Sequence, residues 1–192
     1  DLRASLEKVI GIYRDLGVEV LEVDVGDVEN AQQMLGFRIV LADGYAVHQE
    51  QLRERREDYG QDLLIRFDLG QAVTGAQYAD ALRWIEGFSQ RLETVWQSVD
   101  ALLHPTVPFA APQVQGMDYA KAIRAIPKFT CVYASAGLPA MALPCGFTAQ
   151  GMPLSMELAA PPFAEETLLR LGHAYQGVTD HHLQKAPFLS SN

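Results

Sequence analysis

Apolar residues near the start of the chain change from a helical spacing to a strand-like alternation. The helical set predicts a helix that ends near Gly17, because glycine readily terminates helices. Its members are Leu2, Leu6, Val9, Ile10, Tyr13 and Leu16. From Val18 to Val25, valines alternate with acidic residues, which predicts a half-buried strand. A helix, a glycine and a strand in this order are typical of a layered α/β fold.

The middle of the chain has mainly helical patterns. Val28 to Tyr59 shows helical spacing, with a break expected near Asp43-Gly44. Gly60 to Gly75 has a mixed pattern, and we expect it to include a loop. Thr74 is the predicted N-cap of a long helix that reaches Trp96, since a threonine hydroxyl can accept a hydrogen bond from an amide of the first turn.

The next part of the chain combines a short strand, a proline-containing loop and an interrupted helix. Val99 to His104 is apolar and predicts a strand that stops at Pro105. Thr106 to Pro112 predicts a loop, and loops after strands often line pockets on an α/β scaffold. Tyr119 to Tyr133 predicts a helix that Pro127 kinks or interrupts.

Two apolar runs near the end of the chain predict a β-hairpin. Ala140 to Phe147 and Pro153 to about Ala159 are joined by a short turn at Ala149-Gln150-Gly151. Both runs are apolar at nearly every position, so both faces of these strands should be covered. Pro161-Pro162 then introduces a helix that extends to about Thr179.

These elements predict an α/β fold in which a mixed β-sheet is flanked by helices. We expect a single domain over residues 1–180, because 192 residues with 48% hydrophobic content can bury one sizeable core. Residues 181–192 are expected to form a loosely ordered tail.

The charge and the cysteine content of the chain limit its expected binding partners and its expected cellular compartment. The net charge is −9 and acidic residues interrupt the basic ones, so neither nucleic acid nor an anionic membrane is an expected partner. No apolar run is long enough to span a bilayer. Cys131 and Cys145 are too few for a disulfide scaffold, which indicates a reducing cytoplasm.

The order of several short motifs resembles the C-terminal part of the amidase signature family. The motifs are Asp100 to Thr106, Phe129-Thr130, Gly137-Leu138-Pro139-Ala140, Pro144-Cys145-Gly146-Phe147, Gly151-Met152-Pro153 and Phe163 to Leu169. The resemblance implies an amide hydrolase of the family that uses a Ser-Ser-Lys triad and a covalent acyl-enzyme. It covers most of this chain but only the later part of a full-length family member.

The family's catalytic serines lie in a Gly-Ser-Ser-Gly-Gly type of segment, and these 192 residues contain no such segment. Ser190-Ser191 are the only adjacent serines, and they fall in the expected tail. We therefore assign no catalytic residue and expect the isolated chain to be inactive. An alternative nucleophile is Cys145, although most free cysteines are small buried hydrophobes. His181-His182 has no complementary ligands, and we expect neither a metal nor a cofactor.

The resemblance also suggests the residues that border a substrate cavity. They lie in the loop that begins at Thr106 and at the junction that leads to Gly137, and they are Thr106, Phe109, Phe129, Thr130 and Tyr133. Such a cavity would be apolar and would suit a small aryl or alkyl amide. Ile85 and Pro127 stand where glutamine-using members of the family have an Arg and an Asp, which argues against a role in an amidotransferase.

The sequence thus predicts the C-terminal part of an amidase whose triad is supplied by an upstream region. The alternative is a non-catalytic structural or assembly module derived from the same fold. An incomplete sheet exposes backbone edges that pair with other chains, so we expect self-association or pairing with an N-terminal portion.

Overall fold

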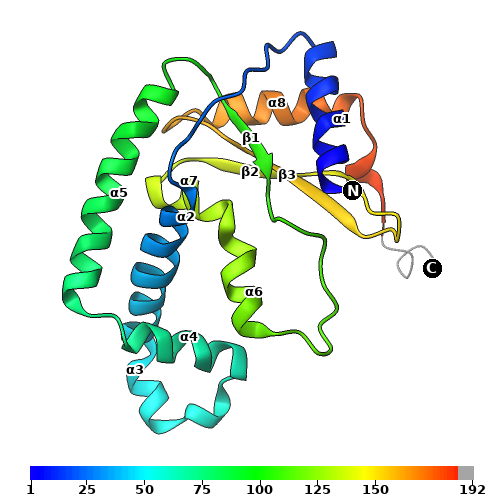
Figure 1. Ribbon diagram of the computed structural model, residues 1–192. Coiled ribbons are helices and arrows are strands. Elements are labelled where there is room, and N and C mark those ends of the chain that lie inside the picture. The colour runs from blue at the N-terminus through cyan, green and yellow to red at the C-terminus, as the bar shows by residue number, and fades with distance from the viewer. Residues whose placement is uncertain (186–192) are drawn as a thin grey trace. The chain divides into compact units, whose positions relative to one another are not determined.

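The chain forms two compact units in a computed structural model that describes residues 1–185, except the side chains of residues 120 and 123 (Figure 1). Unit 1 contains Asp1–Val23, Val99–Pro112 and the described residues from Leu138 onward. Unit 2 contains Asp24–Ser98 and Gln113–Gly137. The α/β class is confirmed, because unit 1 holds a sheet with helices and unit 2 is helical. Organisation as a single domain stays a prediction.

Unit 1 is built on a three-stranded antiparallel sheet. Its strands are β1 (Leu102–Pro105), β2 (Ala140–Phe147) and β3 (Pro153–Ala159), in the order β1-β3-β2. The predicted hairpin is confirmed as β2–β3, with Gly151 at φ +80° in its turn. The strand predicted to stop at Pro105 includes it, because β1 is an edge strand and an edge tolerates a residue without an N–H donor.

The core of unit 1 lies between the sheet and two helices. Both α1 (Leu2–Asp15) and α8 (Glu165–Gly177) pack on the same face of the sheet, as Figure 1 shows. The buried side chains between them are Val9, Tyr13, Leu143, Leu154, Met156, Leu158, Leu168 and Tyr175. The Tyr13 hydroxyl donates to the Leu171 carbonyl over 3.3 Å, which ties the two helices together. The predicted first and last helices are therefore confirmed.

The strand predicted from Val18 to Val25 is wrong. These residues follow α1 without joining the sheet, and the Val18 amide donates back to the Tyr13 carbonyl over 2.9 Å. Val18 and Val20 nevertheless pack against the core of unit 1, whereas Leu21 is exposed. The alternation therefore reflects one-sided packing of an irregular segment rather than a ladder with a neighbouring strand.

Unit 2 is helical throughout its regular structure. Its elements are α2 (Val28–Ala31), a π-helical segment η1 (Gln32–Val40), α3 (Leu41–Glu54), a 3-10 turn η2 (Arg56–Asp58), α4 (Gln61–Gln71), α5 (Gly75–Val95), α6 (Tyr119–Ala125), a 3-10 turn η3 (Ile126–Lys128) and α7 (Thr130–Ala136). The capping role of Thr74 is confirmed, because its hydroxyl accepts from the Gln77 amide and the Gln77 side chain accepts from the Thr74 amide. The interruption at Pro127 is also confirmed, since η3 separates α6 from α7.

One expectation for unit 2 is wrong, because helix α3 runs through Asp43-Gly44 without a break. The loop expected within Gly60 to Gly75 is present at residues 72–74, between α4 and α5. Tertiary contacts explain the unbroken helix: the Tyr78 hydroxyl donates to the Asp43 carboxylate over 3.0 Å, and Gly44 lies against Phe67 of α4. The two helices approach each other closely at Gly70, where a Cβ atom would lie 2.0 Å from the Leu41 carbonyl oxygen.

The end of the described chain forms a 3-10 turn η4 (His181–Leu183). This turn falls at the start of the tail predicted for residues 181–192, and residues 186–192, which include Ser190-Ser191, lie outside the described residues. Among residues 1–185, no helix combines the length and the apolar character needed to cross a membrane.

Candidate functional site

The loop that follows β1 carries two of the predicted substrate residues. Thr106 continues the ladder beyond β1, because its amide donates to the Ser155 carbonyl over 3.2 Å. The Thr106 hydroxyl is buried, and no hydrogen-bond partner for it lies among the described residues. Phe109 is half-buried three residues further along the loop. The loop therefore holds one polar and one aromatic candidate within unit 1.

The other three candidates lie at the start of α7 in unit 2. Phe129 precedes the helix, Thr130 begins it and Tyr133 follows in the first turn. Phe129 and Thr130 are half-buried, whereas Tyr133 is only 4% exposed. Phe129 and Tyr133 are four positions apart and so share one side of the helix. The predicted site residues thus form two local groups, and their role in binding a substrate stays a prediction.

A buried acidic side chain adjoins the loop that begins at Thr106. Glu157 lies in β3 and is 6% exposed. His104 in β1 is its partner in the ladder, so both side chains stand on the same face of the sheet. The His104 Nε2 atom lies 3.8 Å from the Glu157 Oε1 atom. This cross-strand pair is on the opposite face from the core residues Met156 and Leu158, which alternate with Glu157 along β3.

Burial shifts both members of this pair toward their neutral forms. It raises the pKa of Glu157 from its ordinary value of 4.5 to about 7. It also lowers the pKa of His104 below its ordinary 6.5, and a hydrogen bond to the Pro105 carbonyl opposes part of that effect. Burial therefore favours the neutral form of both groups.

The ring of His104 has a defined tautomer. Its Nδ1 atom lies 2.7 Å from the Pro105 carbonyl oxygen, which can only accept a hydrogen bond. Nδ1 must therefore carry a proton, and Nε2 is the atom that gains or loses one. Since Nε2 is the atom that faces Glu157, any change in the charge of the ring takes place next to the carboxyl group.

The sequence placed His104 at the end of a predicted strand, and it gave Glu157 no role. The available signal was an acidic residue within an otherwise apolar strand, Pro153 to Ala159. A charge in such a run either has a partner or loses its charge when buried. The register of β1 against β3 supplies that partner, and a sequence does not reveal register between strands about 50 residues apart.

The two cysteines do not resemble activated nucleophiles. Cys145 is 3% exposed and Cys131 is 7% exposed. Burial raises the pKa of the Cys145 thiol to about 11 and raises that of Cys131 as well. A catalytic cysteine needs the opposite shift, because the thiolate is the nucleophile. Among residues 1–185, no three His, Cys, Asp or Glu side chains lie close enough together to hold a metal ion.

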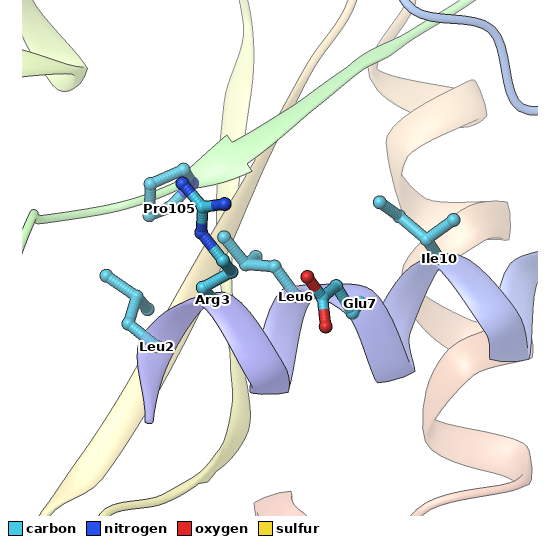
Figure 2. A pocket seen from close by; sticks show the side chains of 6 residues that line it. All are labelled: Leu2, Arg3, Leu6, Glu7, Ile10 and Pro105. Carbon is cyan, nitrogen blue, oxygen red and sulfur yellow. The ribbon is translucent and has the colours of Figure 1, made fainter.

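A shallow apolar groove runs between α1 and the end of β1. Figure 2 shows Leu2, Leu6 and Ile10 on one side of α1 and Pro105 opposite them, with Arg3 and Glu7 also lining the groove. Its volume is about 380 Å³. The charged groups in its lining, Arg3 and Glu7, have opposite signs, so the groove has no preference for an ion of either sign. It lies beside the open edge of β1.

The fold is that of amidases. A solved structure described as an amidase superposes with a TM-score of 0.81 at 23% identity, over 91% of this chain and 41% of that chain. 6-Aminohexanoate cyclic dimer hydrolase superposes with a TM-score of 0.79 at 20% identity, over 97% of this chain and 43% of that one. At these identities the structural likeness speaks for the fold alone.

Sequence relationships identify the family. The Amidase family model matches residues 1–169. The chain is 31% identical over 201 residues to an amidase from Pseudomonas putida, an alignment that covers 98% of this chain. It is also 36% identical over 141 residues to one component of the glutamyl-tRNA(Gln) amidotransferase of Desulforudis audaxviator, an alignment that covers 69% of this chain and 28% of that component. This chain belongs to the amidase family, and it spans 41% of the length of the Pseudomonas amidase.

Proposed function

We propose that these 192 residues form part of a hydrolase that cleaves the carbon–nitrogen bond of an amide, with the reacting groups supplied by sequence outside them. The observation that carries the proposal is the match of residues 1–169 to the Amidase family, and the likeness to the fold of a solved amidase agrees with it. The family resemblance implies a serine acyl-enzyme. A serine hydroxyl becomes a nucleophile only when a neighbouring base removes its proton.

The chemistry of the described residues favours a supporting role over a catalytic one. The buried thiols of Cys131 and Cys145 have raised pKa values, so neither presents a thiolate near neutral pH. The loop of unit 1 offers a hydroxyl at Thr106 and an aromatic ring at Phe109, and unit 2 offers the ring of Phe129; each is a candidate substrate contact by family resemblance. Aromatic walls with few polar groups favour a small, apolar amide substrate.

A hydrolase is favoured over a component of an amidotransferase, although relatives of the second kind are also similar to this chain. Ile85 in α5 and Pro127 in η3 replace the charged pair that the family resemblance associates with glutamine. An aliphatic side chain and a proline cannot pair with the ammonium and carboxylate groups of an amino acid.

The open sheet edges support association with further sequence. Within the described residues, β1 and β2 each have a strand neighbour on one side only. Unpaired backbone groups at such edges favour pairing with another strand. We propose that this pairing joins the chain to the remaining sequence of an amidase, or to a second copy when that sequence is absent. The unpaired thiols of Cys131 and Cys145 support a reducing, cytoplasmic location.

An activity assay tests the proposal. The purified 192-residue chain should release no ammonia or amine from a panel of aliphatic and aryl amides. Release that survives repurification and disappears in Cys145→Ala would overturn the assignment of the reacting groups. A second candidate, a non-catalytic assembly module, predicts inactivity even when the rest of an amidase is supplied. The two candidates are therefore separated by adding that sequence.

A further inference from the structure

The polar side of the sheet in unit 1 contains an arrangement that the proposed function does not use. His104 and Thr106 are two positions apart along β1 and its continuation, so they stand on one face. Glu157 and Ser155 stand on that face of β3, opposite His104 and Thr106 respectively. The buried pair of His104 and Glu157 thus lies next to the first residue of the loop along the ladder.

We propose that His104 and Glu157 hold a single proton between them and that this buried pair positions the loop that begins at Thr106, so that the position of the loop depends on pH. The inference rests on the proposed function only in giving that loop a role, since Thr106 and Phe109 are candidate substrate contacts. His104 and Glu157 are positioning residues here and not catalytic ones.

The shared proton can lie on the Glu157 carboxyl group or on the His104 Nε2 atom. In one arrangement the Glu157 carboxyl is protonated and the His104 ring is neutral. In the other, the proton has moved to Nε2 and leaves a carboxylate beside an imidazolium, with no net change in charge. The 3.8 Å separation of Nε2 and Oε1 allows this transfer after a small rotation of either side chain. The raised pKa of Glu157 and the lowered pKa of His104 favour the neutral arrangement.

The link from the pair to the loop is a hydrogen bond. The Nδ1 proton of His104 is donated over 2.7 Å to the Pro105 carbonyl, which belongs to the peptide that precedes Thr106. A cationic ring donates a stronger hydrogen bond than a neutral one. Gain of a proton at Nε2 therefore strengthens the bond to Pro105 and fixes the entry of the loop, and loss of it relaxes that entry.

The strand neighbours of the pair on this face of the sheet carry no charge. On β2, the residues that flank Glu157 on the same face are Ala140, Ala142 and Pro144, none of which titrates. On β1, Leu102 precedes His104 on that face. Helices α1 and α8, with their charged residues, pack on the opposite, apolar face. Among the described residues, the ion pair recorded for Glu157 is the one with His104.

Nuclear magnetic resonance titration of the full chain tests the inference without a substrate. The signals to follow are the Glu157 carboxyl carbon, the His104 ring and the backbone amides of Thr106 and Phe109, between about pH 5 and about pH 8. The expected result is that the two loop amides shift with the same midpoints as the pair. In Glu157→Gln both amides should shift with a different midpoint, because His104 then titrates without the carboxyl group beside it. The matched control is His173→Asn, which changes an exposed histidine of α8 and should leave the shift in place.

A second variant and a clear negative outcome keep the test decisive. In His104→Asn the loop shift should be lost, since asparagine can still donate to Pro105 but cannot take up a proton. Loop amides that do not move through the titration of the pair, that still move in His104→Asn, or that keep the same midpoint in Glu157→Gln overturn the inference. Because no substrate is involved, such a result leaves the amidase proposal standing, and an inactive protein would leave this inference standing.

Discussion

Replacing either member of the His104–Glu157 pair should change the pH dependence of stability, and the two replacements should change it in opposite directions. The pKa of Glu157 is raised from 4.5 to about 7 in the folded state. Its contribution to stability is therefore complete below pH 4.5 and is lost as the pH rises through about 7. The pKa of His104 is lowered from 6.5, so its contribution is present above pH 6.5 and is lost as the pH falls through the lower folded value.

The magnitude follows from the carboxyl group. A pKa difference between 4.5 and about 7 corresponds to about 3 kcal/mol of unfolding free energy. Both shifts arise mainly from burial, so each remains when the other residue is replaced. In Glu157→Gln, the unfolding free energy should rise by up to about 3 kcal/mol relative to the unaltered chain as the pH rises from about 4.5 to about 7, because the variant lacks the carboxyl group whose contribution is lost over that range. In His104→Asn, the relative unfolding free energy should fall with rising pH instead, because the variant lacks the contribution of the neutral ring.

Urea unfolding followed by circular dichroism at a series of pH values measures these slopes. Each variant is compared with the unaltered chain, so that the pH dependence that other carboxylates give to the unfolding free energy cancels. His173→Asn is the control and should run parallel to the unaltered chain, because this histidine is exposed on α8. If both variants run parallel to the unaltered chain as well, burial does not shift either group and the reasoning is refuted.

Three other changes test the packing. Gly70→Ala should destabilise the chain by about 2 kcal/mol in urea unfolding, because the added Cβ atom meets rigid backbone. The control Gly87→Ala in α5 has room for a Cβ atom and should stabilise the chain by up to about 1 kcal/mol. Equal effects of the two substitutions would contradict the close approach of α3 and α4. Thr74→Ala should cost about 1 kcal/mol through loss of the cap of α5, and an unchanged unfolding midpoint would count against the capping box. A thiol reagent should modify Cys131 and Cys145 only after unfolding, because both are buried, and rapid modification of the folded chain would disagree with that burial.

Local patterns predicted the elements whose ends are marked by distinctive residues. The hairpin β2–β3 is bounded by glycine and proline, and the cap at Thr74 is a short-range hydrogen-bond motif, so both were visible in the sequence. Asp43-Gly44 gave the wrong signal because its helix is maintained by contacts with Tyr78 and Phe67, which lie about 20 or more residues away. Such tertiary contacts override local preference.

In the candidate site, too, the sequence reveals local motifs but not contacts between distant residues. The motifs at Thr106 and Phe129 are local and could be read from the order of residues, although their role in binding remains a prediction. The pairing of His104 with Glu157 depends on the register of β1 against β3, which follows from how the whole sheet packs on α1 and α8. The alternation at Val18 to Val25 failed for a related reason, since within the described residues no strand pairs with that segment to complete a ladder.

The central claim is that these residues form a working part of an amide hydrolase whose reacting groups lie elsewhere. The most direct measurement replaces the matching part of the Pseudomonas putida amidase with these 192 residues and compares its ammonia release from amides with that of the chain alone. The account predicts hydrolysis by the chimera and none by the chain alone. Hydrolysis by the chain alone, or a folded chimera that hydrolyses no amide, would contradict it.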